Sequence, residues 1–153
     1  MTEDYKDLCI GLRSLTENER HIIPNLANAS ALIWQNLPRI NWAGFYIAEP
    51  EGYLLLGPFQ GKPACIRIPS GKGVCGAAYK EDKTQLVNDV HEFPGHIACD
   101  SASNSEIVIP IHNKDNQVAA VLDIDSPVLN RFTEADKEGL EAFVKILEEA
   151  CDW

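Results

Sequence analysis

The residues of this chain that are best suited to chemistry are three cysteines and three acidic residues, all between positions 65 and 125. A thiol becomes a nucleophile and a redox group once it ionises. A carboxylate in an apolar strand costs several kcal/mol unless it is protonated, paired or used for binding. The six residues are Cys65, Cys75, Cys99, Glu106, Asp123 and Asp125. This combination predicts an active site.

A predicted hairpin brings the three acidic residues together. Residues 105–112 and 117–125 have the pattern of strands, and the four residues between them, Asn-Lys-Asp-Asn, are typical of a turn. If these four residues are the whole connection, Glu106 lies directly opposite Asp123, and Asp125 lies diagonal to Glu106. The three carboxylates then share one face, and the apolar residues that alternate with them cover the other face.

Like charges that are clustered in this way cannot all ionise cheaply. At least one of the carboxyl groups is therefore expected to have a raised pKa and to donate a proton, while the others bind a cation such as an α-ammonium group. Trp42 and Tyr46 share one face of a predicted strand over residues 40–47 and are expected to line an apolar or sulfur-bearing side chain. The pocket suits a small zwitterion with a reducible atom.

Three interpretations of the cysteines compete. Each can be a small buried apolar residue, as Cys9 and Cys151 are expected to be. A metal site would use His91, His96 and Cys99, but the chain lacks the closely spaced cysteine pairs typical of zinc sites. In the third interpretation, one thiolate attacks a substrate, becomes a sulfenic acid and is captured by a second cysteine as a disulfide.

The residues alone do not select the attacking thiol. Cys75 lies near the start of a predicted helix, which favours its thiolate, whereas carboxylates near Cys99 would oppose ionisation of that thiol. Either His91 and His96 or the substrate would compensate for that charge. The Gly-Lys-Gly turn before Cys75 lacks the full spacing of a nucleotide-binding loop.

The elements that position these residues are predicted from apolar periodicity. Helices are expected over residues 3–15, 18–37, 74–80 and 133–151. Strands are expected over residues 40–47, 53–57, 64–68, 85–87, 105–112 and 117–125, with Cys65 on the third. A long loop over residues 88–104 holds Cys99 and is typical of a site wall. The order predicts an α+β fold, an antiparallel sheet with helices packed on one face and a loop-built ligand pocket on the other.

Composition limits the classes of function. The 153 residues, 45% of them hydrophobic, suit a single domain over positions 1–153. A net charge of -10 with scattered basic residues argues against nucleic acid and membrane surfaces as partners. An odd number of cysteines, no apolar leader and no membrane-spanning run predict a cytoplasmic protein with reduced thiols. Composition leaves a homodimer open.

Four segments carry a resemblance to a known family. They are Asn41-Trp-Ala-Gly-Phe-Tyr46, Cys65-Ile-Arg-Ile-Pro-Ser-Gly-Lys-Gly-Val-Cys75-Gly, His96-Ile-Ala-Cys-Asp-Ser-Ala-Ser-Asn-Ser-Glu-Ile-Val-Ile-Pro110 and Leu122-Asp-Ile-Asp-Ser126. Together they closely resemble the free methionine-(R)-sulfoxide reductases, which are single GAF-domain enzymes. The resemblance spans nearly the whole chain.

The resemblance implies a role for each cysteine of the site. Cys99 would attack the sulfur of free L-methionine-(R)-sulfoxide, release methionine and become a sulfenic acid. Cys65 would resolve that acid as a disulfide, and Cys75 would be an auxiliary thiol. The resemblance thus favours Cys99 over Cys75 as the nucleophile. Thioredoxin would be the usual reductant, and the reaction would need no cofactor and no metal.

The resemblance also implies roles for the remaining site residues. Glu106, Asp123 and Asp125 would bind the substrate and help to protonate the sulfoxide oxygen. Trp42 and Tyr46 would line the region of the methyl group and side chain. The rival from another class is a GAF sensory module that binds a small ligand without catalysis, and a third possibility is a structural domain that holds zinc.

Overall fold

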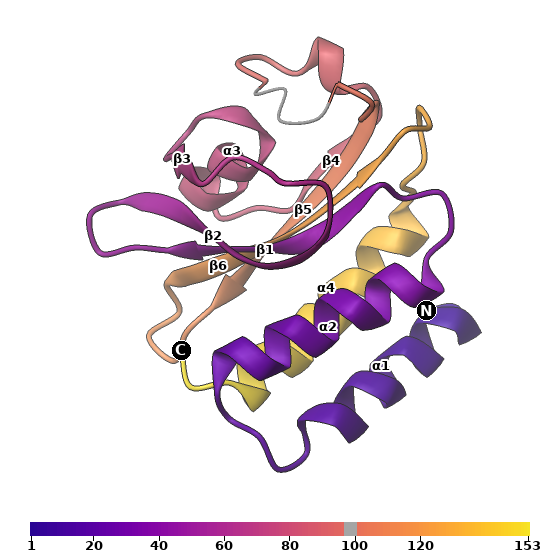
Figure 1. Ribbon diagram of the computed structural model, residues 1–153, viewed down its shortest axis with the longest axis vertical. Helices are drawn as coiled ribbons and strands as arrows, with labels where there is room; N and C mark the ends of the chain where they lie inside the picture. Colours follow the sequence, from indigo (N-terminus) through magenta and orange to yellow (C-terminus); the bar gives the residue numbers. More distant parts are fainter. Residues whose placement is uncertain (97–100) are drawn as a thin grey trace.

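The computed structural model describes residues 1–96 and 101–153 (Figure 1). In these ranges the helices are α1 (Glu3–Thr16), α2 (Ile22–Asn36), α3 (Gly73–Glu81) and α4 (Glu134–Ala150), with a short 3-10 helix at Val90–Glu92. The strands are β1 (Trp42–Ala48), β2 (Tyr53–Gly61), β3 (Arg67–Pro69), β4 (Gln85–Val87), β5 (Ser105–His112) and β6 (Val118–Ser126). The predicted elements are therefore present in the predicted order.

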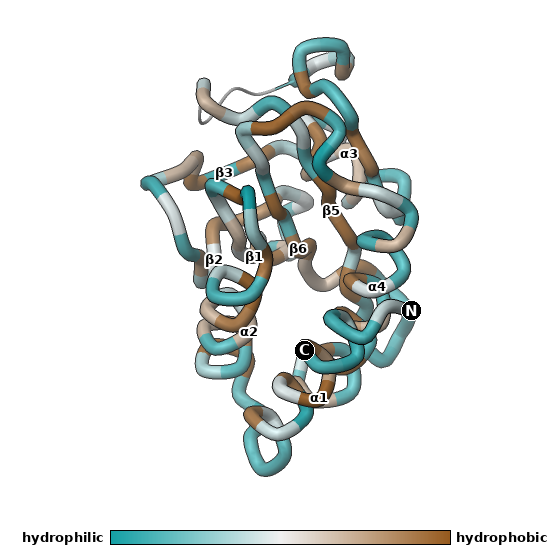
Figure 2. Tube along the Cα trace, turned by 90° about the vertical axis from the view of Figure 1, so that its right-hand side faces the viewer, coloured by the Kyte–Doolittle hydropathy of each residue, from teal (hydrophilic) through white to brown (hydrophobic). Residues whose placement is uncertain are grey.

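Within the described ranges, the strands form one antiparallel sheet of six strands in the order β3-β2-β1-β6-β5-β4. Helices α1, α2 and α4 form a layer on one side of the sheet, and α3 lies on the other side (Figures 1 and 2). The predicted α+β fold is confirmed, and α3 adds a short helix to the pocket face. No helix in the described part of the chain is long and apolar enough to span a membrane.

The main core lies between the sheet and the three-helix layer. The alternate residues of β5 and β6 that were expected to meet helices do so; they are Ile107, Ile109, Ile111, Ala120, Leu122 and Ile124. Figure 2 shows apolar and polar stretches alternating along α1, α2 and α4, as expected for helices with one buried side. Because successive side chains of a strand point to opposite faces, this core directs the remaining side chains of β5 and β6 toward the pocket.

Local chemistry sets the ends of the long helices. Thr133 and Asp136 form a capping box at the start of α4, in which each side chain accepts a hydrogen bond from the backbone N–H of the other. Pro24 is the third residue of α2, where no intrahelical partner for its missing N–H is needed. These starts place α2 and α4 under the strands that carry the site.

The register of the β5–β6 hairpin differs from the prediction by two residues. The backbone N–H of Asn113, rather than His112, pairs with the carbonyl of Gln117 at 2.9 Å, which shortens the loop and shifts the pairing by one residue. A bulge between Ile111 and His112 shifts it by one more. A slip of two residues leaves every side chain on its predicted face.

Cys65 does not lie on a strand, contrary to the prediction. The predicted third strand shortens to β3, and residues 62–65 form a connection before it. The reason is that side chains of β1 donate hydrogen bonds to the backbone carbonyls of this connection. Trp42 Nε1 donates to the carbonyl of Lys62 at 3.1 Å, and the hydroxyl of Tyr46 donates to the carbonyl of Cys65 at 2.9 Å. These contacts replace the bonds that a neighbouring strand would make.

Candidate active site

A cavity of about 50 Å³ lies on the sheet face that carries α3. It brings together most of the residues predicted for the site, namely Trp42, Tyr46, Cys75, Glu106, Asp123 and Asp125. Cys65 is beside the cavity, next to Ala64, which lines it. Cys99 falls outside the residues that the structure describes.

The three carboxylates come from the two strands of the β5–β6 hairpin. Glu106 on β5 pairs with Asp125 on β6, and Asp123 pairs with Val108, so Asp123 lies diagonal to Glu106. The predicted arrangement is corrected in this respect, because Glu106 was expected opposite Asp123. Glu106 and Asp123 are 7% and 5% exposed, while Asp125 is half-buried. Because the three carboxylates share one face and are shielded from water, the charge of each affects the pKa of the others.

Burial shifts the pKa values of Glu106 and Asp123. It raises the pKa of Glu106 well above the usual range, and the nearby Asp123 and Asp125 add to the rise. Burial also raises the pKa of Asp123, although hydrogen bonds with Glu106, Cys75 and Asp125 offset part of that rise. A carboxyl group with a raised pKa was expected from the sequence, and Glu106 has such a shift.

Asp123 also offers an acceptor to a ligand. Its Oδ1 is buried and has no hydrogen-bond partner among the described residues. A buried carboxylate oxygen is costly to leave unsatisfied, so a donor that enters the cavity gains a strong hydrogen bond there. Gly44 stands opposite Asp123 in the β1–β6 pair and adds no side chain beside that carboxylate.

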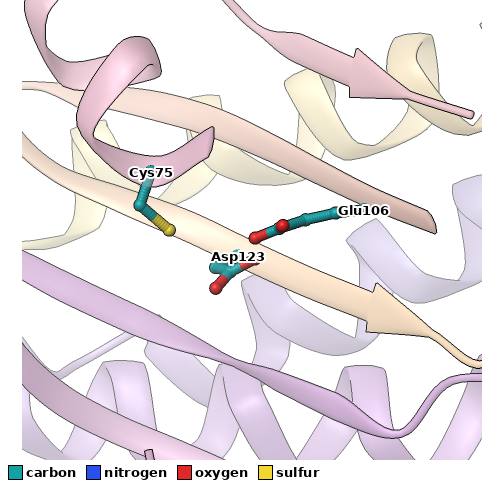
Figure 3. A group of neighbouring side chains, drawn as sticks. All are labelled: Cys75, Glu106 and Asp123. Carbon is teal, nitrogen blue, oxygen red and sulfur yellow. The ribbon is translucent and has the colours of Figure 1, made fainter. Parts of the chain in front are cut away.

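Cys75 points from α3 toward Glu106 and Asp123 (Figure 3). Its sulfur and one oxygen of each carboxylate all lie within 4.8 Å of one another. Burial raises the pKa of the Cys75 thiol well above its usual range, and the charges of Asp123, Glu106 and Asp125 raise it further. The expectation that the helix start stabilises a Cys75 thiolate is therefore wrong, because burial and carboxylates outweigh a helix end.

The same three atoms have the spacing of a cation site. Within the described residues, Cys75, Glu106 and Asp123 are the group whose ligand atoms lie close enough together to hold a metal ion. The zinc site considered from sequence, with His91, His96 and Cys99, has Cys99 outside the described residues. His91 instead contacts Asn104 through Nε2 at 3.0 Å. Among the described residues, a cation would therefore be held by Cys75, Glu106 and Asp123.

The aromatic wall of the cavity has a second role that sequence reasoning missed. Trp42 stacks on Tyr46 with ring centroids 5.9 Å apart and on Phe59 at 5.1 Å. Both site aromatics also donate to the carbonyls of residues 62 and 65, as described above. Burial, followed by the charge of Asp123, raises the pKa of Tyr46, so its hydroxyl stays a donor. Trp42 and Tyr46 thus line the cavity and hold the segment that carries Cys65.

His96 is a further lining residue, considered from the sequence as a metal ligand and as a group that compensates for the charge near Cys99. Its Nδ1 is buried with no hydrogen-bond partner among the described residues. Burial and the neighbouring His91 lower the pKa of His96, although the charge of Asp123 opposes this. The neutral ring can therefore accept or donate a proton at the cavity. The sequence signal was its position in the motif that ends at Pro110.

The remaining cysteines differ in state and position. Cys9 and Cys151 are free thiols buried in the main core, on the opposite side of the sheet from the cavity. Burial raises the pKa of both, as expected for apolar packing residues. Cys65, in contrast, is disulfide-bonded. Among the described cysteines, Cys65 and Cys75 therefore lie on the pocket face of the sheet.

Comparison with known proteins places this geometry in a family. Residues 16–151 match the model of the GAF domain. The chain is 54% identical over 147 residues to the free methionine-R-sulfoxide reductase of Escherichia coli, covering 96% of this chain and 88% of that protein. The chain belongs to this family. It is a GAF-domain protein of the free methionine-(R)-sulfoxide reductase type, as the sequence motifs predicted.

Solved structures of the reductase family share the fold closely. The reduced form of fRMsr of Staphylococcus aureus superposes with a TM-score of 0.92 at 55% identity, covering 95% of this chain and 94% of that one. The free methionine-R-sulfoxide reductase of Neisseria meningitidis, solved in complex with its substrate, gives a TM-score of 0.92 at 41% identity, covering 95% and 87%. At these identities the reductase fold extends over nearly the whole chain.

Proposed function

We propose that this protein reduces free L-methionine-(R)-sulfoxide to L-methionine with a cysteine nucleophile. The observation that carries the proposal is the buried pair of Glu106 and Asp123 in an aromatic-walled cavity. One member of the pair holds a proton and the other has an unpartnered oxygen. A zwitterionic amino acid with a basic sulfoxide oxygen needs both functions, and relatives at 54% and 44% identity are named for this activity.

The carboxylates bind the substrate amine. The α-ammonium group donates to Asp123 Oδ1 and lies near Asp125, in the space that a cation would occupy beside Cys75. Its charge offsets the carboxylates, which lowers the cost of their burial. Trp42 and Tyr46 contact the carbons next to the sulfoxide sulfur through their rings. Peptide-bound methionine sulfoxide lacks this ammonium group, so we expect little activity on it.

The first chemical step transfers oxygen from substrate to enzyme. The Cys99 thiolate attacks the sulfoxide sulfur while Glu106 delivers its proton to the sulfoxide oxygen. The oxygen then passes from the substrate sulfur to the Cys99 sulfur: the sulfur–oxygen bond of the substrate and the transient bond between the two sulfurs break, methionine leaves, and Cys99 becomes a sulfenic acid. Raised pKa values suit this role, because the donor must still hold its proton at neutral pH.

The second step regenerates the thiol. Cys65 attacks the sulfenic sulfur of Cys99, water leaves, and a disulfide links the two residues. The disulfide-bonded state of Cys65 supports its part in such an exchange. Thioredoxin then reduces the disulfide in a cytoplasmic setting. Cys75 remains a neutral auxiliary thiol beside the carboxylates and takes no covalent part in this cycle.

Turnover with defined reductants tests the proposal. With dithiothreitol or thioredoxin, the protein should release methionine from the free R sulfoxide, with little release from the S epimer. Cys99→Ser should remove at least about 10³-fold of the activity, because a hydroxyl is a far weaker nucleophile than a thiolate. Cys9→Ala, which removes a thiol of the main core, is the matched control and should keep the parental activity. Substrate binding without turnover would instead indicate a sensory GAF module.

A further inference from the structure

The charge of this chain is distributed unevenly along the sequence. The chain has 13 basic and 23 acidic residues, yet residues 52–80 contain Lys62, Arg67, Lys72 and Lys80 and no Asp or Glu. This stretch is thus a positive segment in a protein of net charge -10. A local charge of opposite sign to the whole protein is a feature of surfaces that select a charged partner.

The positive segment surrounds Cys65. Lys62 and Lys72 line the mouth of the cavity, and Arg67 is exposed two residues after Cys65. Between Cys65 and Arg67 lies Ile66, whose side chain is 60% exposed. We call residues 62–67 the Cys65 rim. It combines an exposed apolar side chain, positive charges and a sulfur in a disulfide.

The backbone of the Cys65 rim is held in place by hydrogen bonds from β1 and β2. The carbonyls of Lys62 and Cys65 accept hydrogen bonds from Trp42 and Tyr46. The carbonyl of Ile66 accepts one from the backbone N–H of Leu56 at 2.8 Å. A bulky apolar side chain is therefore displayed to solvent on a backbone fixed at three points. Such a pre-organised anchor lowers the entropic cost of docking a partner.

We propose that the Cys65 rim is the docking surface for the reductant, an acidic dithiol protein of the thioredoxin class. This inference rests on the proposed function, which requires that the Cys65–Cys99 disulfide be reduced after each turnover. Ile66 is the apolar anchor, and Arg67, with Lys62 and Lys72 beside it, attracts the acidic surface of the partner. A surface of this charge disfavours a basic partner.

Docking at the Cys65 rim determines which sulfur of the disulfide the reductant attacks. A thiolate of the reductant bonds to the Cys65 sulfur, the Cys65–Cys99 bond breaks, and Cys99 leaves as the thiolate needed for the next turnover. The second thiolate of the reductant then breaks the mixed disulfide and frees Cys65. The reductant departs as a disulfide, so two electrons pass to the protein. Contact at Ile66 excludes water from this exchange.

Two variants test the surface without altering the cavity. Ile66 and Arg67 are not among the cavity-lining residues, so Ile66→Asp and Arg67→Glu leave the substrate site intact. The matched controls are Ile10→Asp and Arg13→Glu on α1, in the helix layer on the other side of the sheet, where Ile10 is 64% exposed. The readout is the rate at which oxidised protein gains thiols from a net-negative thioredoxin or from dithiothreitol, which requires no turnover of sulfoxide.

We expect Ile66→Asp to slow reduction by thioredoxin about 10-fold or more and Arg67→Glu to slow it roughly 3-fold, while both control variants match the parent. Reduction by dithiothreitol, a small molecule that needs no docking surface, should be the same in all five proteins. The thioredoxin rate of the parent should also fall with added salt.

Equal thioredoxin rates for Ile66→Asp, Arg67→Glu and the parent would overturn the docking surface while leaving the proposed reductase intact. An equal slowing with dithiothreitol would also overturn it, because the residues would then act on the disulfide itself. Oxidised parent protein that gains no thiols from either reductant would refute both proposals.

Discussion

Glu106 on β5 stands directly opposite Asp125 on β6, and Asp123 lies diagonal to Glu106 on the same face. Because Glu106 and Asp123 are almost fully buried, ionising both without a cation is costly. Protonated Glu106 and the open oxygen of Asp123 are therefore complementary, one as donor and one as acceptor. This relationship is the basis for the proposed roles, in which Glu106 transfers a proton and Asp123 binds the ammonium group.

Glu106→Gln is expected to lower kcat for free methionine-(R)-sulfoxide by about 10²- to 10⁴-fold, because an amide cannot transfer a proton to the sulfoxide oxygen. In the parent, activity should fall as pH rises through the raised pKa of Glu106, since only the protonated acid is competent. The pH profile of kcat checks this, with Glu51→Gln in an exposed turn as control. A Glu106→Gln variant with parental kcat would remove Glu106 from the mechanism.

Cys75 is expected to resist alkylation in the folded protein. Burial and the nearby carboxylates raise its pKa, so little thiolate is present at neutral pH. Iodoacetamide labelling read by peptide mass spectrometry should be at least about 10²-fold slower in the native state than in urea. Cys9 and Cys151 serve as buried reference thiols in the same digest. Rapid native labelling of Cys75 would contradict the neutral thiol and reopen a redox role for it.

Gly44→Ala is expected to destabilise the fold beneath the site. A Cβ at this position would lie 2.3 Å from Cβ of Phe59, the residue on which Trp42 stacks, so the sheet would have to shift. We expect a loss of about 1–3 kcal/mol in the free energy of unfolding, measured by urea titration.

The same substitution at Gly11 provides the control. This helical position has ordinary contact space, with Leu32 Cδ2 at 3.4 Å, so Gly11→Ala should raise stability by roughly 0.5–1 kcal/mol. Equal effects at the two positions would show that Gly44 is not required by packing.

His112 is expected to make stability depend on pH. Burial lowers its pKa, but hydrogen bonds with Asp82 at 2.6 Å and Glu148 at 2.7 Å outweigh burial and raise it. Because the folded pKa lies above the unfolded value of 6.5, this stabilisation is complete below pH 6.5 and is lost as pH rises through the folded pKa.

The contribution should be on the order of 1 kcal/mol or less, because Asp82 is 45% exposed and water screens it. Urea titrations of the parent and His112→Gln at pH 6 and pH 9 measure it. The parent should lose more stability than the variant over this interval. Parallel losses would show that the ion pairs contribute nothing.

The faces of the site strands were predictable from sequence, because side chains of a strand alternate with a period of two. The register was not, since the hairpin loop lost one residue to pairing and the bulge at Ile111 added a second shift. Glu106, Asp123 and Asp125 still share one face because the two shifts sum to an even number. The alternation of side chains thus predicts which carboxylates share a face, but it does not predict which of them lie directly opposite one another.

Other features depend on contacts between distant segments and had no local signal. Cys65 leaves the strand because Trp42 and Tyr46 bond to the carbonyls around it. The pKa of Cys75 is raised by burial and then by the charge of Asp123, because α3 packs over β6 and covers the thiol beside that carboxylate. A helix start near a cysteine is visible in sequence, whereas the carboxylates that outweigh it come from the hairpin.

The most direct test of the account is a single turnover without reductant. Fully reduced protein mixed with an equal amount of free L-methionine-(R)-sulfoxide should release one methionine per chain, and peptide mapping should then find a Cys65–Cys99 disulfide with Cys75 still a free thiol. A disulfide that includes Cys75, or methionine release with no new disulfide, would contradict it.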